Sequence, residues 1–116
     1  MAKPGRVDRD AAYLDDIRES CGLIQAYLKG KTFADFVAER ALQDAIVLRL
    51  SVIGEAAKSL SIQAKAAQPK VNWRDIGRFR DLAVHHYWKI EASLVWGIAK
   101  DDVPALLKML PASRAR

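Results

Sequence analysis

The feature that most constrains the fold is a long segment, residues 39 to about 67, in which apolar side chains recur at steps of three and four. Six of them fall on one face of a helix: Leu42, Ile46, Leu50, Ile53, Ala57 and Leu60. A second apolar row follows beside it: Ala41, Ala45, Leu48, Val52 and Ala56. Because both rows together cover much of the circumference, we expect this helix to be central or to be shared with a partner subunit.

Gly54 lies inside this segment. A glycine in a helix interior costs about 1 kcal/mol relative to alanine. Its presence therefore predicts that a second helix backbone approaches closely at this position.

Residues 9 to 28 form a second helical pattern, which Asp8 or Asp10 is placed to cap. Its apolar stripe contains Ala11, Leu14, Ile17, Cys21, Ile24 and Leu28. Gly30 ends the pattern, and Thr32 opens a short helical turn with Phe33, Phe36 and Val37.

The second half of the chain contains two more helical regions. Pro69 ends the long segment, and Asn72 is placed to cap a helix that begins at Trp73 and runs toward Tyr87. A last region spans roughly residues 91 to 110, and we expect a break and restart within it at residues 101–104.

No segment alternates apolar and polar residues as a strand does, and the sequence contains no internal repeat. A chain of 116 residues with 51% hydrophobic content can build one core but not two. We predict an all-α, compact bundle of about five helices in a single domain, residues 1–116. Short flexible basic tails are expected at about 1–7 and 112–116.

The net charge is +5 and the isoelectric point is about 9.6. Much of the excess lies near the chain ends, but residues 70–90 alone carry a net charge of +3, which favours an anionic partner. Cys21 is the sole cysteine, so no disulfide can form within the chain, and a reducing compartment fits. No run approaches the roughly 18 apolar residues that span a bilayer. We expect a cytoplasmic protein with no membrane contact.

Candidate chemistry lies between Ile76 and Tyr87. At about 100° per residue, Arg80, Asp81 and His85 fall on one side of the helix, and Tyr87 lies near Arg80 if the helix extends that far. The opposite side carries Ile76, Phe79, Leu82, Ala83 and His86. We therefore expect His85 to be displayed and His86 to be packed in the core or in an interface.

RNA cleavage without a metal needs a group that moves a proton from the ribose 2′-hydroxyl, a cation at the phosphate and an acid for the leaving oxygen. Histidine can be the base or the acid at neutral pH, and arginine suits the phosphate. Asp81 could orient His85. One histidine per chain does not easily supply both base and acid, so a twofold dimer that joins two copies of this helix is expected.

The spacing of Arg80, His85 and Tyr87, with four residues and then one residue between them, resembles the signature of the HepT-like toxins, minimal members of the HEPN ribonuclease superfamily. Flanking segments are similar in order and spacing: Ile53-Gly54-Glu55-Ala56-Ala57, Asn72-Trp73-Arg74-Asp75-Ile76, Val95-Trp96-Gly97-Ile98 and Asp102-Val103-Pro104-Ala105-Leu106. The resemblance covers nearly the whole chain. It implies a HEPN-like homodimer that cleaves RNA without metal or cofactor, with Arg80 and His85 as the catalytic pair.

The resemblance further implies the toxin of a bacterial type VII toxin-antitoxin system. A cognate nucleotidyltransferase antitoxin would neutralise it by adenylylation of Tyr87, because a nucleotide beside Arg80 would add bulk and negative charge. This chain departs from the family at Asp81, where asparagine is frequent. A carboxylate there is expected to slow catalysis.

Several interpretations stay open. Glu55 is either a buried partner that orients Arg80 or merely a polar residue on the exposed side, and the cations Arg74, Arg78 and Lys89 either contact RNA phosphates or form a solvated surface. Without the family resemblance, the Arg80 face reads as an ordinary solvated helix face. The alternative function is a non-catalytic helical binding subunit of a nucleotidyltransferase complex, in which Asp81 marks lost activity. A helix-turn-helix DNA-binding protein is disfavoured because no short glycine turn joins two suitable helices.

Overall fold

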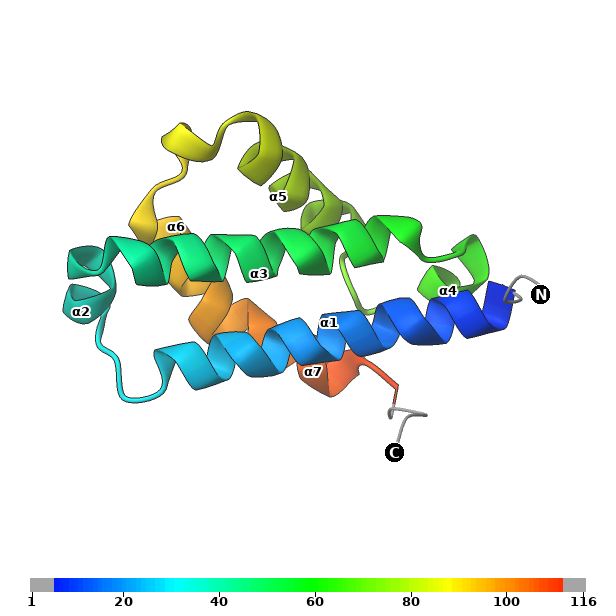
Figure 1. Ribbon diagram of the computed structural model, residues 1–116. Helices are drawn as coiled ribbons and strands as arrows, with labels where there is room; N and C mark the ends of the chain where they lie inside the picture. Colours follow the sequence, from blue (N-terminus) through cyan, green and yellow to red (C-terminus); the bar gives the residue numbers. More distant parts are fainter. Residues whose placement is uncertain (1–5, 112–116) are drawn as a thin grey trace, which may run out of the picture.

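The computed structural model of the protein describes residues 6–111. Within this part of the chain all regular structure is helical, as the sequence predicts (Figure 1). The α-helices are α1 (Arg6–Leu28), α2 (Phe33–Ala38), α3 (Arg40–Ser59), α4 (Ile62–Ala66), α5 (Trp73–His85), α6 (Ala92–Gly97) and α7 (Val103–Met109). A 3-10 turn, η1 (Tyr87–Lys89), follows α5, and a π-helical segment, η2 (Ile98–Asp102), joins α6 to α7.

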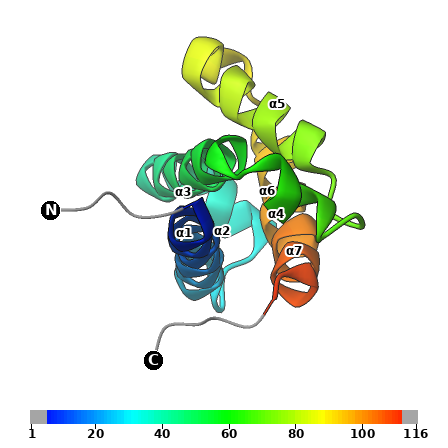
Figure 2. The same cartoon turned by 90° about the vertical axis from the view of Figure 1, so that its right-hand side faces the viewer.

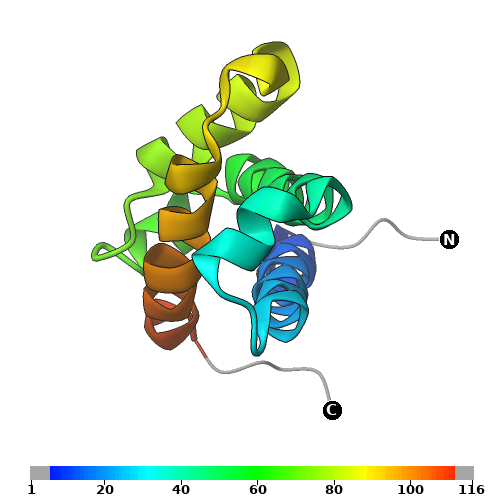
Figure 3. The same ribbon diagram turned by 90° about the vertical axis from the view of Figure 1, so that its left-hand side faces the viewer.

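Helix α3 is the centre of the arrangement. The long helices α1 and α3 lie side by side, and α6, η2 and α7 cover another side of this pair (Figures 1 and 2). Helix α5 packs mainly on α3, on the side away from α1, and projects beyond the other helices (Figures 2 and 3). The prediction of a central helix is therefore confirmed.

The predicted apolar stripes form the core. On α1, Ile17, Cys21 and Ile24 are completely buried, and the first row of α3 contributes Ile46, Leu50, Ile53, Ala57 and Leu60. The second row of α3 is covered unevenly, because Ala56 is buried whereas Leu48 is 56% exposed. This helix thus keeps apolar positions on the surface, Ala41 and Leu48, beside its buried first row.

The junction of α3 and α4 corrects two predictions. The single helix expected over residues 39 to about 67 ends at Ser59, and Ser61 caps α4 by accepting from the Ala64 N–H at 3.1 Å. Asp10, predicted as a possible cap of α1, lies inside that helix, as Asp8 does, because α1 begins at Arg6. The Asp10 carboxylate instead accepts from the Ser61 N–H at 2.9 Å and from its hydroxyl at 2.6 Å, which holds the turn against α1.

The turn between α1 and α3 follows the predicted chemistry. Gly30 adopts a φ of 75°, a left-handed conformation that glycine adopts without strain. Thr32 then forms a capping box with Asp35: the Asp35 N–H donates to the Thr32 hydroxyl at 3.1 Å, and the Thr32 N–H donates to the Asp35 carboxylate at 2.9 Å. These bonds lower the pKa of Asp35.

The break expected at residues 101–104 is absent. The backbone stays helical from Ala92 to Met109, and η2 absorbs the change in register, with Asp102 making no side-chain cap. Pro104 is tolerated because it lies in the first turn of α7, where its missing N–H costs little. Of the predicted tails, Arg6 and Val7 begin α1, and the remainder lies outside the described residues. None of the described helices is long and apolar enough to cross a membrane.

Candidate active site

The crossing of α3 and α5 is built on Gly54. A Cβ atom added to Gly54 would lie 2.3 Å from the Arg80 Cβ and 3.1 Å from the Ile76 carbonyl oxygen. Any larger residue would therefore push α5 away from α3. The hypothesis that a helix backbone approaches Gly54 closely is confirmed, and the approaching helix is the one that carries Arg80.

Arg80 is held in place by two carboxylates. Its Nε lies 2.7 Å from Glu55 Oε2, and its Nη1 lies 3.2 Å from Asp81 Oδ1. The Arg80 side chain is only 25% exposed, whereas that of Glu55 is 60% exposed. Glu55 is thus not buried, as one of the two interpretations had it, but it contacts Arg80 from the surface.

Lys58 is a member of this cluster that the sequence reasoning missed. Its Nζ lies 2.8 Å from Asp81 Oδ1, the same oxygen that Arg80 contacts. The hydrogen bond from Lys58, and after it the bond from Arg80, lower the pKa of Asp81. The sequence could have indicated Lys58, because it follows Glu55 by three residues and therefore lies on the same face of the helix.

His85 is the last residue of α5 and is exposed. As predicted, its side chain is on the surface. Within residues 6–111, however, no hydrogen bond or ion pair links His85 to Arg80 or Asp81. Five residues of helix rise separate His85 from Arg80 by about 7.5 Å along the α5 axis. The predicted contact between Asp81 and His85 is not formed, because Asp81 binds Lys58 and Arg80 instead.

The prediction that His86 packs into the core is wrong for the protomer. Helix α5 ends one residue earlier, and His86 is its C-cap with φ −137° and ψ 37°. Helical angular positions no longer apply there, and His86 is exposed, with its ring 6.0 Å from the ring of Trp88.

Tyr87 lies in η1 rather than in α5, and its half-buried ring packs against the core. Its hydroxyl donates a hydrogen bond to the Asp44 carboxylate on α3. Arg40, one turn earlier, contacts Asp44 at 3.2 Å and places its guanidinium 5.8 Å from the centre of the Tyr87 ring. Neither Arg40 nor Asp44 is identifiable from sequence spacing, because the contact depends on how η1 folds back onto α3.

Tyr87 and Arg80 therefore contact α3 at different heights. The partner of Tyr87 is Asp44, and the partner of Arg80 is Glu55. Eleven residues of helix separate these partners by about 16 Å. The sequence places Tyr87 near Arg80 only if the helix extends to Tyr87, and in the structure α5 ends two residues earlier.

The predicted phosphate contacts are all on the surface. Arg74 and Arg78 are exposed on α5, with Arg78 4.0 Å from Asp75, and Lys89 is exposed in η1. Steps of four, three and four residues align Arg74, Arg78, Asp81 and His85 on one face of α5. This row, called the α5 stripe below, runs from the start of the helix to its end.

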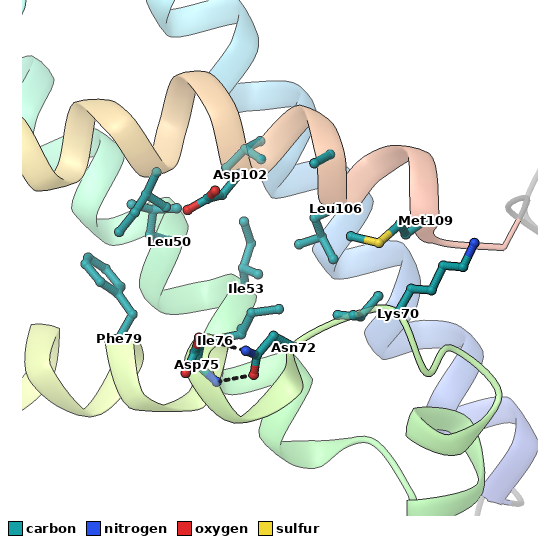
Figure 4. A pocket seen from close by; sticks show the side chains of 14 residues that line it. Leu50, Ile53, Lys70, Asn72, Asp75, Ile76, Phe79, Asp102, Leu106 and Met109 are labelled. Carbon is teal, nitrogen blue, oxygen red and sulfur yellow. Dashed lines mark hydrogen bonds between the residues drawn. The ribbon is translucent and has the colours of Figure 1, made fainter.

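A cavity of about 290 Å³ lies elsewhere, between α3, α5, η2, α7 and the loop before α5 (Figure 4). Its lining is mainly apolar, and the Asp102 carboxylate points toward it. Of the residues predicted to form the site, none lines this cavity. The side chains around it are Leu50, Ile53, Lys70, Val71, Asn72, Asp75, Ile76, Phe79, Ile98, Asp102, Val103, Ala105, Leu106 and Met109.

The fold and the site together define an all-helical protein that displays an arginine and a histidine from one helix. A sequence profile of the family described as "Ribonuclease HepT-like" matches residues 17–112. The chain belongs to this HepT-like ribonuclease family.

Named relatives agree with this assignment. The chain is 34% identical over 94 residues to "Probable ribonuclease HepT" of Thermococcus cleftensis, covering 81% of this chain and 86% of that protein. It is 33% identical over 98 residues to a "Putative RNase" of Caldanaerobacter subterraneus subsp. tengcongensis, covering 84% and 88%. A longer relative, "Gamma-glutamylcyclotransferase and putative RNase" of Methanocaldococcus jannaschii, is 36% identical over 94 residues, but the match covers only 42% of it. The comparison with solved structures found no match.

Proposed function

We propose that this protein is an RNA endonuclease that cleaves by attack of the ribose 2′-hydroxyl on the adjacent phosphate, with Arg80 and His85 as its catalytic residues. The observation that carries the proposal is the fixed position of Arg80 between Glu55 and Asp81 on the same helix that exposes His85 at its end. Membership of the HepT-like ribonuclease family supports the choice of RNA.

In this mechanism, Arg80 donates hydrogen bonds to the phosphate as charge builds up on its oxygens. Glu55 acts through Arg80: its carboxylate lies 2.7 Å from Nε and positions the guanidinium. His85 moves the proton, since an imidazole can accept or donate one at neutral pH. The α5 stripe gives the RNA backbone two further cations, Arg74 and Arg78, and Lys89 adds a third beyond the helix.

The reaction needs a base and an acid, so we propose that two copies of the chain meet at α5 and each supplies one His85. The end of α5 supports this proposal. Val84 on α5 is 51% exposed and Trp88, four residues later in η1, is 74% exposed, and large apolar side chains exposed close together favour an interface. A dimer through this surface would cover both side chains.

The experiment is an RNA cleavage assay in EDTA that detects 2′,3′-cyclic phosphate ends. His85→Ala and Arg80→Ala are expected to abolish cleavage, whereas His86→Ala, the matched control one residue away, is expected to retain it. If the His85→Ala protein cuts as fast as the parent, the proposed function is wrong. Light scattering on the same samples tests the dimer.

We further propose that the protein is the toxin of a bacterial type VII toxin-antitoxin system in the cytoplasm and that a cognate nucleotidyltransferase adenylylates Tyr87. The structure refines how such a modification would act. Asp44, the partner of Tyr87, lies about 16 Å along α3 from Glu55, the partner of Arg80, so we expect the added phosphate at the end of α5 that carries His85. The experiment is to incubate the protein with ATP and the neighbouring nucleotidyltransferase and to locate the added AMP by mass spectrometry.

One observation favours the alternative, a non-catalytic binding subunit of a nucleotidyltransferase complex. The Asp81 carboxylate lies on Arg80 at the point where a phosphate would bind. This alternative predicts tight association with the nucleotidyltransferase and no RNA cleavage at any protein concentration.

A further inference from the structure

Two cationic side chains, one from α3 and one from α5, each pack against a glycine of the opposite helix. Arg80 of α5 lies over Gly54 of α3, and Lys58 of α3 lies over Gly77 of α5, with its Cγ 3.4 Å from the position of a Cβ at Gly77. At Gly54 an added Cβ would push the Arg80 stem away, whereas at Gly77 an added Cβ would only make ordinary van der Waals contact with the Lys58 stem. Both stems therefore cross the helix interface.

The two cationic groups converge on one oxygen. Lys58 Nζ lies 2.8 Å and Arg80 Nη1 lies 3.2 Å from Asp81 Oδ1. These are distances of charge-assisted hydrogen bonds, of the kind that arginine and lysine also make with phosphate oxygens. Glu55 Oε2 lies 2.7 Å from a different nitrogen of Arg80, Nε.

We propose that Lys58 and Arg80 form a seat for one phosphate group of RNA and that Asp81 occupies this seat as an internal competitor until RNA displaces it. The proposal rests on the proposed function for the source of the phosphate. It adds Lys58 as a substrate-binding residue and gives Asp81 an inhibitory role in place of an orienting one.

The competitor is bound loosely enough to be displaced. The side chains of Lys58 and Asp81 are 44% and 50% exposed, and exposed ion pairs of this kind contribute little to stability. Rotation of the short Asp81 side chain toward solvent would free both cations without moving a helix. The local charge would then change from neutral, with Glu55 and Asp81 balancing Lys58 and Arg80, to a net +1.

The experiment measures binding rather than cleavage. The probe is a fluorescent single-stranded 2′-O-methyl oligonucleotide, which cannot be cut because its 2′-oxygen is blocked, and the readout is fluorescence anisotropy. At low salt, Asp81→Asn is expected to lower the Kd by about three- to tenfold, the size of one removed charge near a phosphate in water. Lys58→Gln is expected to raise the Kd by a similar factor.

Matched controls carry the same charge changes away from the seat. Asp101→Asn on η2 and Lys29→Gln after α1 both alter exposed residues, and each is expected to shift the Kd by less than the corresponding change at the seat. Lys58→Gln should also cost more in the Asp81→Asn background, where Lys58 is released.

Three outcomes overturn the proposal: Asp81→Asn binds no tighter than the parent, it binds tighter only to the extent that Asp101→Asn does, or no variant binds the probe. The result is separable from that of the cleavage assay. If the protein binds the probe as described but never cuts RNA, the phosphate seat is supported and the proposed nuclease function is wrong. If it cuts RNA but Asp81→Asn does not change binding, the nuclease function is supported and the seat is wrong.

Discussion

Gly54 and Arg80 are in direct contact across the α3 and α5 crossing, with no room for a Cβ atom at residue 54. The contact explains why a helix with so regular an apolar pattern accepts a glycine in its interior. It also ties the position of the proposed phosphate-binding guanidinium to the packing of the fold, since the Arg80 stem is fixed by α3 before its head group meets Glu55.

Gly54→Ala is therefore expected to destabilise the protein, although alanine is the better helix former. Overpacking of a close helix contact costs about 1 to 3 kcal/mol. Gly22→Ala on α1 is the matched control, because no atom lies within 4 Å of an added Cβ there, and it is expected to stabilise by up to about 1 kcal/mol. Urea unfolding of the three proteins measures both effects. Equal stability of Gly54→Ala and the parent would contradict the close approach.

Tyr87→Phe separates the packing of the Tyr87 ring from the hydrogen bond of its hydroxyl group. The ring keeps its packing against the core, while the hydrogen bond to Asp44 is lost, which is expected to cost about 0.5 to 1.5 kcal/mol. If Tyr87 is the acceptor of AMP, the same variant should take up no label from ATP in the presence of the nucleotidyltransferase. Tyr27→Phe, which alters an exposed tyrosine on α1, should be labelled like the parent. Labelling of Tyr87→Phe would show that another residue is modified.

The sequence was most informative where local chemistry decides the structure. The caps at Thr32 and Asn72, the stripe of α1 and the first row of α3 follow from residue spacing alone. It was least informative where a distant side chain intervenes: the end of α3 depends on Asp10, which lies 51 positions before Ser61. A periodic pattern that continues past Ser59 gives no sign of this break.

In the candidate site, too, the sequence was least informative where the structure depends on more than the local helix. Helix geometry placed Arg80 on the displayed side of α5, but its stem packs on Gly54 of α3 and its side chain is only 25% exposed. Because α5 ends at His85, His86 does not pack in the core of the protomer, and the condition for Tyr87 to lie beside Arg80, a helix that extends to Tyr87, is not met. Lys58 was missed because its role appears only when α3 and α5 are brought together over Gly54 and Gly77.

Asp81 makes part of the stability dependent on pH. Hydrogen bonds from Lys58 and Arg80 lower its pKa in the folded protein below the ordinary value of about 3.9. A lowered pKa stabilises the fold above the unfolded-state pKa, and this contribution is lost as the pH falls through the folded-state pKa. The stability difference between the parent and Asp81→Asn should thus be constant above about pH 5 and shrink below pH 4. Urea unfolding at a series of pH values measures it, and a difference that persists unchanged at the lowest pH would contradict the ion pair.

Cys21 is expected to be unreactive in the native protein. It is completely buried on α1, and burial raises the pKa of its thiol to about 11, whereas the thiolate is the reactive form. Ellman's reagent at pH 8 should react only as fast as the protein opens, and therefore faster in Gly54→Ala than in the parent.

Because the folded-state pKa lies above the unfolded value, Cys21 should also lower stability as the pH rises from about 9 to 11. That pH dependence should be absent in Cys21→Ala, whose loss of packing adds only a constant difference. Rapid, stoichiometric labelling of the native parent would show that α1 does not bury Cys21.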